Sequence, residues 1–344
     1  MEHKEKTCHN DLNSLNHWLE ANTYQSSQFK NLQDLYNAKR GRTISLIIPT
    51  LNEEKTIADI VSKILGVLND DFPIIDELIV IDGGSTDDTV VIVRELTLHY
   101  EKLQVIDENL VLPEINTKKG KGNQLWKGLY YSSGDIVLYC DSDIRNFDIH
   151  MIYGLIGPLL SGNIKFIKGF YDRSLVLHEH VRTPGGGRVT ELCARPLLNL
   201  FYPQLSGFIQ PLGGEYGAYR ELLENIEYTS GYGVEINILI DVFEKYGIAT
   251  MGQVDLICRD HRHQNIGALS MMSFTIMNVV LRKNKNLNLH NNLLMKKYKK
   301  NHNSNEKCNN LGEIDLNKHF MLLQNSQDDF LPPLKQFLAV HPIT

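Results

Sequence analysis

Four short apolar segments, separated by stretches with helical character, constrain the fold of this chain more than any other feature. They cover residues 44–49, 77–82, 103–106 and 135–140. Between the first two, apolar side chains recur at spacings of three and four from Ile57 to Leu68, which predicts an amphipathic helix. Strands that alternate with helices at this spacing predict a parallel, doubly wound α/β sheet. We expect Pro49 to end the first strand.

The rest of the chain has a mixed pattern. Strands are predicted at residues 164–170 and 248–258, and helices at residues 190–200 and 234–246. Residues 1–40 are polar with a helical periodicity, which predicts helices alone. The Asn- and Lys-rich residues 282–310 are interpreted as a mobile loop or a weakly helical extension, and we expect residues 320–338 to pack back on the domain.

The net charge and the cysteine content narrow the expected cellular compartment and the expected binding partners. The formal net charge of −6 argues against non-specific binding of nucleic acid. The five cysteines are an odd number without a C-x-x-C pair, which is typical of reduced thiols in a cytoplasm. Residues 1–6 open no apolar segment, so no signal peptide is expected. The apolar stretch at 270–281 is shorter than the roughly 18–20 residues that span a membrane, and no membrane partner is expected.

Two acids follow the fourth apolar segment, at Asp141 and Asp143 on either side of Ser142. Open α/β sheets place their ligands at the carboxyl ends of their strands. Residues i and i+2 of an extended chain point the same way, so both carboxylates can face one ligand at about 6–7 Å from each other. Such a pair suits a hard divalent cation that also binds phosphates. A D-x-D taken alone is also typical of turns and helix caps.

Three loops precede this pair. Residues 49–54, P-T-L-N-E-E, could bind a uracil edge and ribose hydroxyls, or simply cap a helix. Asp82 and Gly83 offer an acceptor and a close backbone approach, although a tight turn needs the same residues. Residues 118–122, K-K-G-K-G, form a cationic loop at a helix start that could bind a pyrophosphate. A solvated charge run is the alternative for this third loop.

Together these motifs resemble those of the GT-A type glycosyltransferases. The second half narrows the resemblance to the retaining family of glucosyl-3-phosphoglycerate synthases, through P-G-G-G-R-V-T-E-L at 184–192, Q-P-L-G-G-E at 210–215, Y-G-V-E at 232–235 and R-D-H-R at 259–262. The resemblance covers about residues 15–270. It implies a Rossmann-like GT-A nucleotide-sugar-binding domain, a mixed α/β half that binds the acceptor, and helical termini. We therefore divide the chain into a helical extension (1–40), a nucleotide-sugar-binding half (41–150), an acceptor-binding half (151–270) and a helical or flexible extension (271–344).

The resemblance also implies individual site residues. A donor site for UDP-glucose is implied at Pro49, Thr50, Leu51, Asn52, Glu53, Asp82, Gly83, Lys121, Asp141, Ser142, Leu212, Tyr232 and Arg259. An acceptor site for 3-phosphoglycerate is implied at Gly187, Arg188, Val189, Thr190 and His263. Asp143 and His261 would bind a divalent cation, Mg²⁺ or Mn²⁺, and Glu235 and Asp143 would be the catalytic residues.

The residues themselves are compatible with these roles. Glycines before Arg188 and Thr190, at a helix start, can form an anion site, although a flexible loop is the alternative. Glu235 could equally be an ordinary first-turn acid of a helix, and His261 part of a solvated basic turn. In the family, asparagine and arginine follow the His-Arg pair, whereas this chain has His263 and Gln264, which could shift the acceptor preference.

The predicted activity is therefore transfer of glucose, with retention, from UDP-glucose to the 2-hydroxyl of 3-phospho-D-glycerate. One alternative is the same fold with a mannose donor, or with glycerate or a polyprenyl phosphate as acceptor. Others are a non-catalytic nucleotide-sugar-binding protein and a nucleotidyltransferase. The first of these would be expected to lack Asp143, His261 or Glu235, and all three are present. We expect a homodimer, to which the N-terminal helices or the C-terminal segment could contribute.

Overall fold

The computed structural model describes most of the 344 residues. The described ranges are 13–68, 71–113, 119–172, 174–177, 181–184, 187–260, 265–284, 295–300, 320–325 and 329–340. Within them no helix is both long and apolar enough to cross a membrane.

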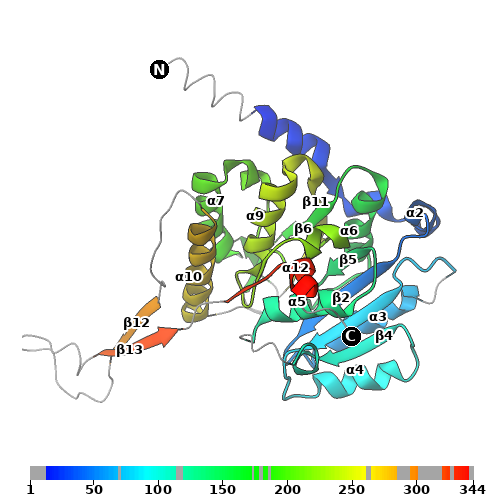
Figure 1. Cartoon of the computed structure of the whole chain (residues 1–344), viewed down its shortest axis with the longest axis horizontal. Helices are drawn as coiled ribbons and strands as arrows, with labels where there is room; N and C mark the ends of the chain where they lie inside the picture. The colour runs from blue at the N-terminus through cyan, green and yellow to red at the C-terminus, as the bar shows by residue number, and fades with distance from the viewer. Residues whose placement is uncertain are drawn as a thin grey trace, which may run out of the picture.

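The four predicted strands form one parallel block, as the sequence pattern indicated. They are β2 (Ile44–Thr50), β3 (Glu77–Asp82), β4 (Leu103–Asp107) and β5 (Ile136–Tyr139). Their order in the sheet is β5-β2-β3-β4, and every neighbouring pair is parallel. The intervening helices are α3 (Ile57–Leu68), α4 (Thr89–Thr97) and α5 (Lys121–Tyr131). Figure 1 shows this block in blue to cyan-green.

The same sheet continues through the second half of the chain. Its further strands are β1 (Thr23–Gln25), β6 (Phe166–Asp172), β9 (Tyr216–Tyr219) and β11 (Met251–Cys258), in the order β1-β11-β6-β9 before β5. β9 is antiparallel to both of its neighbours, and the other pairs are parallel. The sheet thus runs across residue 150, and the division into donor and acceptor halves stays a functional interpretation.

Pro49 lies inside β2, and the prediction that it ends the strand was wrong. Its partner on β3 is Ile81, and Thr50 still pairs with Asp82. The ladder to β5 ends at Ile47, and the Pro49 carbonyl instead accepts a hydrogen bond from the Ser142 hydroxyl at 2.8 Å. Because the backbone of Pro49 faces this side, beyond the end of β5, the missing N–H removes no hydrogen bond of the sheet.

Apolar residues cover both faces of the sheet. Along β2, Ile47 faces one core, which also contains Trp126 of α5, while Leu46 and Ile48 face the other, which contains α3. All of these side chains are buried. This alternation with a period of two explains why the strands read as continuous apolar runs: helices cover both sides.

Further helices and short strands surround the central sheet. In the first half they are η1 (Ser26–Phe29), α2 (Leu32–Lys39) and η2 (Glu108–Leu110), with a helix over residues 13–22. In the second half they are α6 (His150–Ser161), β7 (Ser174–Leu177), β8 (Val181–Pro184), the π-helix Thr190–Ala194, α7 (Arg195–Phe201), η4 (Pro203–Gly207), α8 (Arg220–Glu224), β10 (Tyr228–Thr229), α9 (Val234–Tyr246), η5 (Ile248–Thr250) and α10 (Ile266–Lys283). The predicted helices at 190–200 and 234–246 are thereby confirmed.

Both ends of the chain hold strands that the sequence pattern did not predict. Thr23–Gln25 is the sheet strand β1, although only helices were expected before residue 41. Met295–Lys300 is β12, paired antiparallel with β13 (Phe320–Asn325), so a loop or weak helix was the wrong prediction there. A strand pair of this kind depends on a partner some 25 residues away, which local composition does not reveal.

The predicted return of the C-terminal segment is confirmed. β14 (Phe330–Leu331) pairs antiparallel with β10, and α12 (Leu334–Val340) follows it. Trp126 donates a hydrogen bond to the Pro332 carbonyl at 2.9 Å, and Phe337 packs edge-on against the Trp126 ring at 5.3 Å. This segment therefore fastens onto α5, the helix whose first turn carries the cationic loop.

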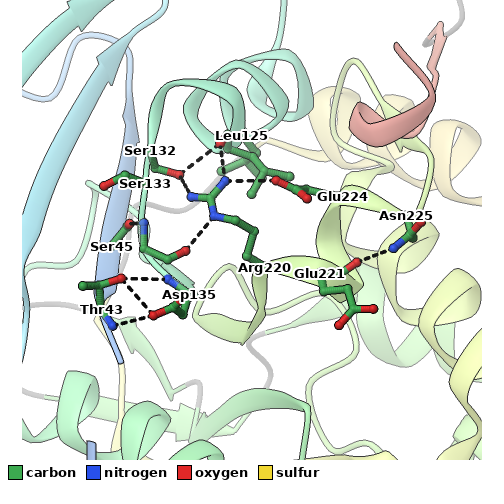
Figure 2. A network of polar contacts seen from close by, with 12 residues as sticks. Thr43, Ser45, Leu125, Ser132, Ser133, Asp135, Arg220, Glu221, Glu224 and Asn225 are labelled. Carbon is green, nitrogen blue, oxygen red and sulfur yellow. Dashed lines mark hydrogen bonds and ion pairs between the residues drawn. The ribbon is translucent and has the colours of Figure 1, made fainter. Parts of the chain in front are cut away.

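Arg220 fixes the other end of α5 (Figure 2). Its guanidinium donates to the carbonyls of Leu129 and Gly134 at 3.0 and 2.6 Å and to the Ser132 hydroxyl at 2.6 Å. These acceptors lie at the carboxyl end of α5 and in the turn into β5. A cation at this end of a helix also interacts favourably with the helix dipole. The network thus ties the carboxyl end of α5 to the turn into β5 and to α8.

Candidate active site

A cleft of about 530 Å³ opens at the carboxyl ends of β2, β3 and β5. Ten residues of the predicted site line it: Pro49, Thr50, Leu51, Glu53, Gly83, Lys121, Asp141, Ser142, Asp143 and Tyr232. They come from five separate stretches of sequence. The sheet brings them together because parallel strands end at one edge, where α/β proteins bind their ligands.

Two predicted donor residues build the loops of the cleft. Asn52 has a left-handed backbone, with φ of 58°, and its side-chain oxygen accepts a hydrogen bond from the Thr86 amide at 2.8 Å. The buried Asp82 accepts from the amides of Gly84 and Ser85, both at 2.9 Å. Neither residue lines the cleft, so a direct contact of either with a donor stays a prediction.

The cationic loop owes its position to a glycine that touches another strand. A Cβ on Gly122 would lie 1.7 Å from the carbonyl oxygen of Thr229, so only glycine fits. The next amide, of Asn123, donates to the Ser230 carbonyl at 2.9 Å. α5 thus starts directly against β10, and Lys119, Gly120 and Lys121 line the cleft.

Lys121 and Arg259 bind the acids between them. The Lys121 ammonium is 2.5 Å from both Asp141 Oδ1 and Glu235 Oε1. One Arg259 nitrogen donates to Asp141 at 2.9 Å and to Asp143 at 2.5 Å, which confirms that the two acids face the same point. Arg259 comes from the end of β11, more than 110 residues away in sequence.

A buried carboxylate, Glu215, holds Arg259 from behind. The second Arg259 nitrogen donates to both Glu215 oxygens, at 2.7 and 2.9 Å, and to the Tyr171 hydroxyl at 2.9 Å. Glu215 is fully buried and Arg259 only 4% exposed. Arg259 therefore holds the acids of the cleft in place, and its direct contact with the donor stays a prediction.

The ionisation of these groups follows from burial and mutual charge. Burial alone would raise the pKa of Asp141, but Lys121 and Arg259 hold it well below its ordinary value. Burial alone would lower the pKa of Lys121, but Asp141 and Glu235 raise it above its ordinary value. Burial raises the pKa of Glu215, against the lowering effect of Arg259. Asp141 is thus a carboxylate and Lys121 an ammonium across the physiological range.

The predicted acceptor residues lie apart from the lining of this cleft. They sit where the π-helix begins: Gly187 is half-buried, Arg188 is exposed, and Val189 and Thr190 are buried. Among the described residues the Thr190 hydroxyl has no hydrogen-bond partner. A buried, unpaired hydroxyl is costly, and a ligand oxygen would satisfy it. The predicted acceptor residue His263 lies outside the described residues.

The predicted metal site is described in part, because His261 also lies outside the described residues. Of the groups that are described, no three His, Cys, Asp or Glu side chains form a complete metal site. Asp143 lines the cleft and its side chain is one-third exposed, with one oxygen held by Arg259. A partly exposed carboxylate fixed in this way is the hard oxygen donor that Mg²⁺ and Mn²⁺ prefer, so the site fits such an ion.

Several residues of the site were missed. Glu108 and Gln124 line the cleft, and Gln124 donates to the carbonyls of Thr50 and Ile81, at the ends of β2 and β3. Glu215 and Lys168 lie beneath it. Glu215 belongs to the Q-P-L-G-G-E motif, which was a usable signal; Lys168 and Gln124 lie in an ordinary strand and helix and carried none.

Comparisons with known proteins agree with this geometry. The model of the family described as "Glycosyl transferase family 2" matches residues 45–174. The glucosyl-3-phosphoglycerate synthase of Petrotoga mobilis is 44% identical over 328 residues, which cover 93% of this chain and 92% of that protein. The enzyme of the same name from Mycobacterium tuberculosis H37Rv is 43% identical over 252 residues, 72% of this chain and 75% of that protein.

Solved structures show the same fold. A crystal structure of glucosyl-3-phosphoglycerate synthase from M. tuberculosis, in complex with Mn²⁺, UDP-glucose and phosphoglyceric acid, matches with a TM-score of 0.75 and 34% identity over 92% of this chain and 98% of that chain. The mannosyl-3-phosphoglycerate synthase of Rubrobacter xylanophilus matches with a TM-score of 0.78 and 33% identity over 94% of this chain and 98% of that chain. The GT-A fold predicted from the sequence is confirmed.

Proposed function

Because the chain belongs to the glucosyl-3-phosphoglycerate synthase family, we propose that it transfers glucose from UDP-glucose to the 2-hydroxyl of 3-phospho-D-glycerate with retention. The observation that carries the proposal is the cleft at the sheet edge, which both Lys121 and Asp143 line, with Lys121 paired to the neighbouring Asp141 at 2.5 Å. A cation and a metal-binding carboxylate that line the same cleft are what a nucleotide diphosphate requires. The M. tuberculosis enzyme of this family has been solved with UDP-glucose, phosphoglycerate and Mn²⁺ bound.

Lys121 is the protein cation assigned to the leaving group. It lines the cleft, whereas Arg259 lies behind Asp141 and Asp143. In the reaction the bond between the glucose C1 and the phosphate oxygen breaks, and the acceptor 2-oxygen forms the new bond on the same face. The acceptor proton passes to the departing phosphate oxygen. Lys121 stabilises the negative charge that develops on UDP.

Glu235 orients Lys121. Its carboxylate is nearly buried, lies in the first turn of α9 and contacts the Lys121 ammonium at 2.5 Å. It does not line the cleft in the described part of the chain. This favours a role in holding Lys121 over a role as the attacking nucleophile.

A divalent cation completes the proposed site, bound by Asp143 and by His261. When bound, it supplies positive charge that binds the donor diphosphate and stabilises the leaving group. Arg259 neutralises Asp141 and holds one oxygen of Asp143, so the Asp143 carboxylate is oriented before any ion binds.

The proposed acceptor site lies at the start of the π-helix. The unpaired Thr190 hydroxyl and the exposed Arg188 offer a hydroxyl and a guanidinium fork to a phosphorylated carboxylic acid. Phosphoglycerate carries several negative charges, and this protein has a net charge of −6, so a local cationic site is required.

A mannosyl donor is the second candidate, because the R. xylanophilus structure that matches this chain is a mannosyl-3-phosphoglycerate synthase. A screen of UDP-glucose, GDP-glucose and GDP-mannose with 3-phosphoglycerate, with and without Mg²⁺, distinguishes the two. The proposal predicts cation-dependent release of UDP from UDP-glucose as the fastest reaction. Faster turnover of GDP-mannose would show that the donor is GDP-mannose and that the assignment of UDP-glucose is wrong.

We also propose a cytoplasmic homodimer. The described cysteines, Cys140, Cys193 and Cys258, are free thiols, as a reducing compartment permits. Light scattering of the full-length chain tests the dimer, and a monomer at micromolar concentration would contradict it.

A further inference from the structure

A lysine without a role in the proposed reaction lies beneath the cleft. Lys168 is in the middle of β6, opposite Tyr216 of β9, and its side chain is only 1% exposed. Lysine is almost never fully buried unless it is paired, because removing an ammonium from water is costly. Lys168 therefore needs a specific explanation.

The contacts of Lys168 lead to the wall of the predicted sugar site. Its ammonium donates a hydrogen bond to the Gly213 carbonyl at 2.7 Å and lies 4.6 Å from the centre of the Tyr216 ring. Gly213 follows Leu212, the residue implied in binding the donor sugar. The contact thus joins a central strand to the turn at residues 212–214.

That turn is packed against the acids of the cleft. A Cβ on Gly214 would lie 2.2 Å from Asp141 Oδ1, so the Gly214 backbone touches the carboxylate. On the other side, the Gly169 amide donates to the Glu215 carbonyl at 2.8 Å. A shift of the Gly213 carbonyl would therefore move both Leu212 and the support of Asp141.

The charge of Lys168 also belongs to the site. The network has four carboxylates, at Asp141, Asp143, Glu215 and Glu235, and within the described part of the chain their ion pairs are with Lys121 and Arg259. Burial lowers the pKa of Lys168 to about 8, while Glu235 is the carboxylate that raises it most. The ammonium is thus a third cation below the cleft, within the electrostatic reach of these acids.

We propose that Lys168 is a positioning residue for the donor sugar: it holds the turn at 212–214 through the Gly213 carbonyl and keeps Leu212 and Asp141 in place. The inference rests on the proposed function, because it assumes that a hexose occupies the space beside this turn. It assigns Lys168 to the sugar and not to the uridine, whose predicted contacts come from the loops after β2 and β3.

The test compares binding of UDP with binding of UDP-glucose. Full-length Lys168→Met, Lys168→Arg and wild-type protein are titrated with each ligand in Mg²⁺ by calorimetry, and kcat and KM are measured with 3-phosphoglycerate. Lys39→Met is the matched control, because Lys39 is also buried but bonds to Asp76 and the Pro73 carbonyl at the amino end of the sheet. Thermal unfolding checks the fold of each variant.

Lys168→Met is expected to lower the affinity for UDP-glucose about tenfold or more, while the affinity for UDP changes by less than about threefold. This is the size expected for the loss of one charged hydrogen bond at a sugar subsite. Lys168→Arg, which keeps the cation, should recover part of this loss, and Lys39→Met should leave both affinities unchanged. Equal losses for UDP and UDP-glucose, or no loss for either, would overturn the proposal.

A second set of variants keeps the test valid if Lys168→Met does not fold. Leu212→Ala alters a half-buried side chain, and it should show the same selective loss of UDP-glucose affinity. In the double variant Leu212→Ala/Lys168→Arg, the loss of UDP-glucose affinity should be less than the sum of the two single losses, because both changes act on one turn. Additive effects would contradict the coupling. Wild-type turnover with UDP-glucose tests the proposed function independently of these comparisons.

Discussion

Arg259 is the residue on which the acids of the cleft depend, and its removal should be severe. In Arg259→Met the carboxylates of Glu215, Asp141 and Asp143 lose the guanidinium that now lies 2.5–2.9 Å from them. Glu215 is fully buried and would be left as an uncompensated charge. Breaking a buried ion pair by removing one partner costs about 3–5 kcal/mol of unfolding free energy. We expect a loss in this range at pH 8, measured by urea unfolding.

The loss should shrink as the pH falls. The pKa of Glu215 is raised in the folded protein, by burial that Arg259 only partly offsets, so without Arg259 it should rise further. A carboxyl whose pKa is higher in the folded than in the unfolded state destabilises the fold above its unfolded pKa. That penalty shrinks as the pH falls from the folded pKa towards the unfolded pKa, because the buried acid takes up a proton. The variant should therefore be closer to wild type at pH 5 than at pH 8.

Two controls make the reasoning refutable. The double variant Arg259→Met/Glu215→Leu removes the stranded charge and should regain a large part of the loss. Arg195→Met breaks a surface pair with Glu191 and should cost less than about 1 kcal/mol. A loss below about 1 kcal/mol in Arg259→Met, or no recovery in the double variant, would refute the buried network described above.

Three further outcomes are expected. Gly122→Ala should lower the affinity for UDP about tenfold or more, because its Cβ would meet the Thr229 carbonyl. Gly66→Ala, whose Cβ would lie in open space, should leave this affinity unchanged. Calorimetry with UDP compares the two variants, and equal affinities would contradict the close approach at Gly122. Steady-state kinetics of Arg188→Ala should show a far larger rise in the Michaelis constant for the phosphoglycerate acceptor than in that for UDP-glucose, and equal effects on both would remove Arg188 from the acceptor site. Asp143→Ala should abolish cation-dependent UDP release. The thermal unfolding midpoint should stay near that of wild type, because this side chain is one-third exposed. Turnover near the wild-type rate would show that Asp143 does not bind the metal.

The central sheet was predictable because its information is local. β3 and α9 match their predicted bounds, since an apolar run and an amphipathic period each set their own limits. The acids after β5 could also be placed, because a strand end fixes their direction. The prediction for Pro49 failed because the partner of its carbonyl, the Ser142 hydroxyl, lies in the segment after β5, far away in the sequence.

The support beneath the site could not be predicted from the chain. Arg259 meets Asp143 from 116 positions away, and Lys168 meets the Gly213 carbonyl from 45. The R-D-H-R motif assigned Arg259 to the site but did not reveal its partners, and Lys168 looks locally like an ordinary strand residue. Only the folded sheet brings each of them to its partners. β1 was missed for the same reason: three residues gain strand structure only by pairing with β11.

Proton NMR of the product tests the central claim most directly. Purified protein is incubated with UDP-glucose, 3-phospho-D-glycerate and Mg²⁺, and the anomeric signal of the transferred sugar is followed. The account predicts that the donor signal is replaced by a new α-glucosyl signal coupled to carbon 2 of the glycerate, and that no new signal forms after chelation of the cation. A β-linked product, or no glucosylated acceptor at all, would contradict it.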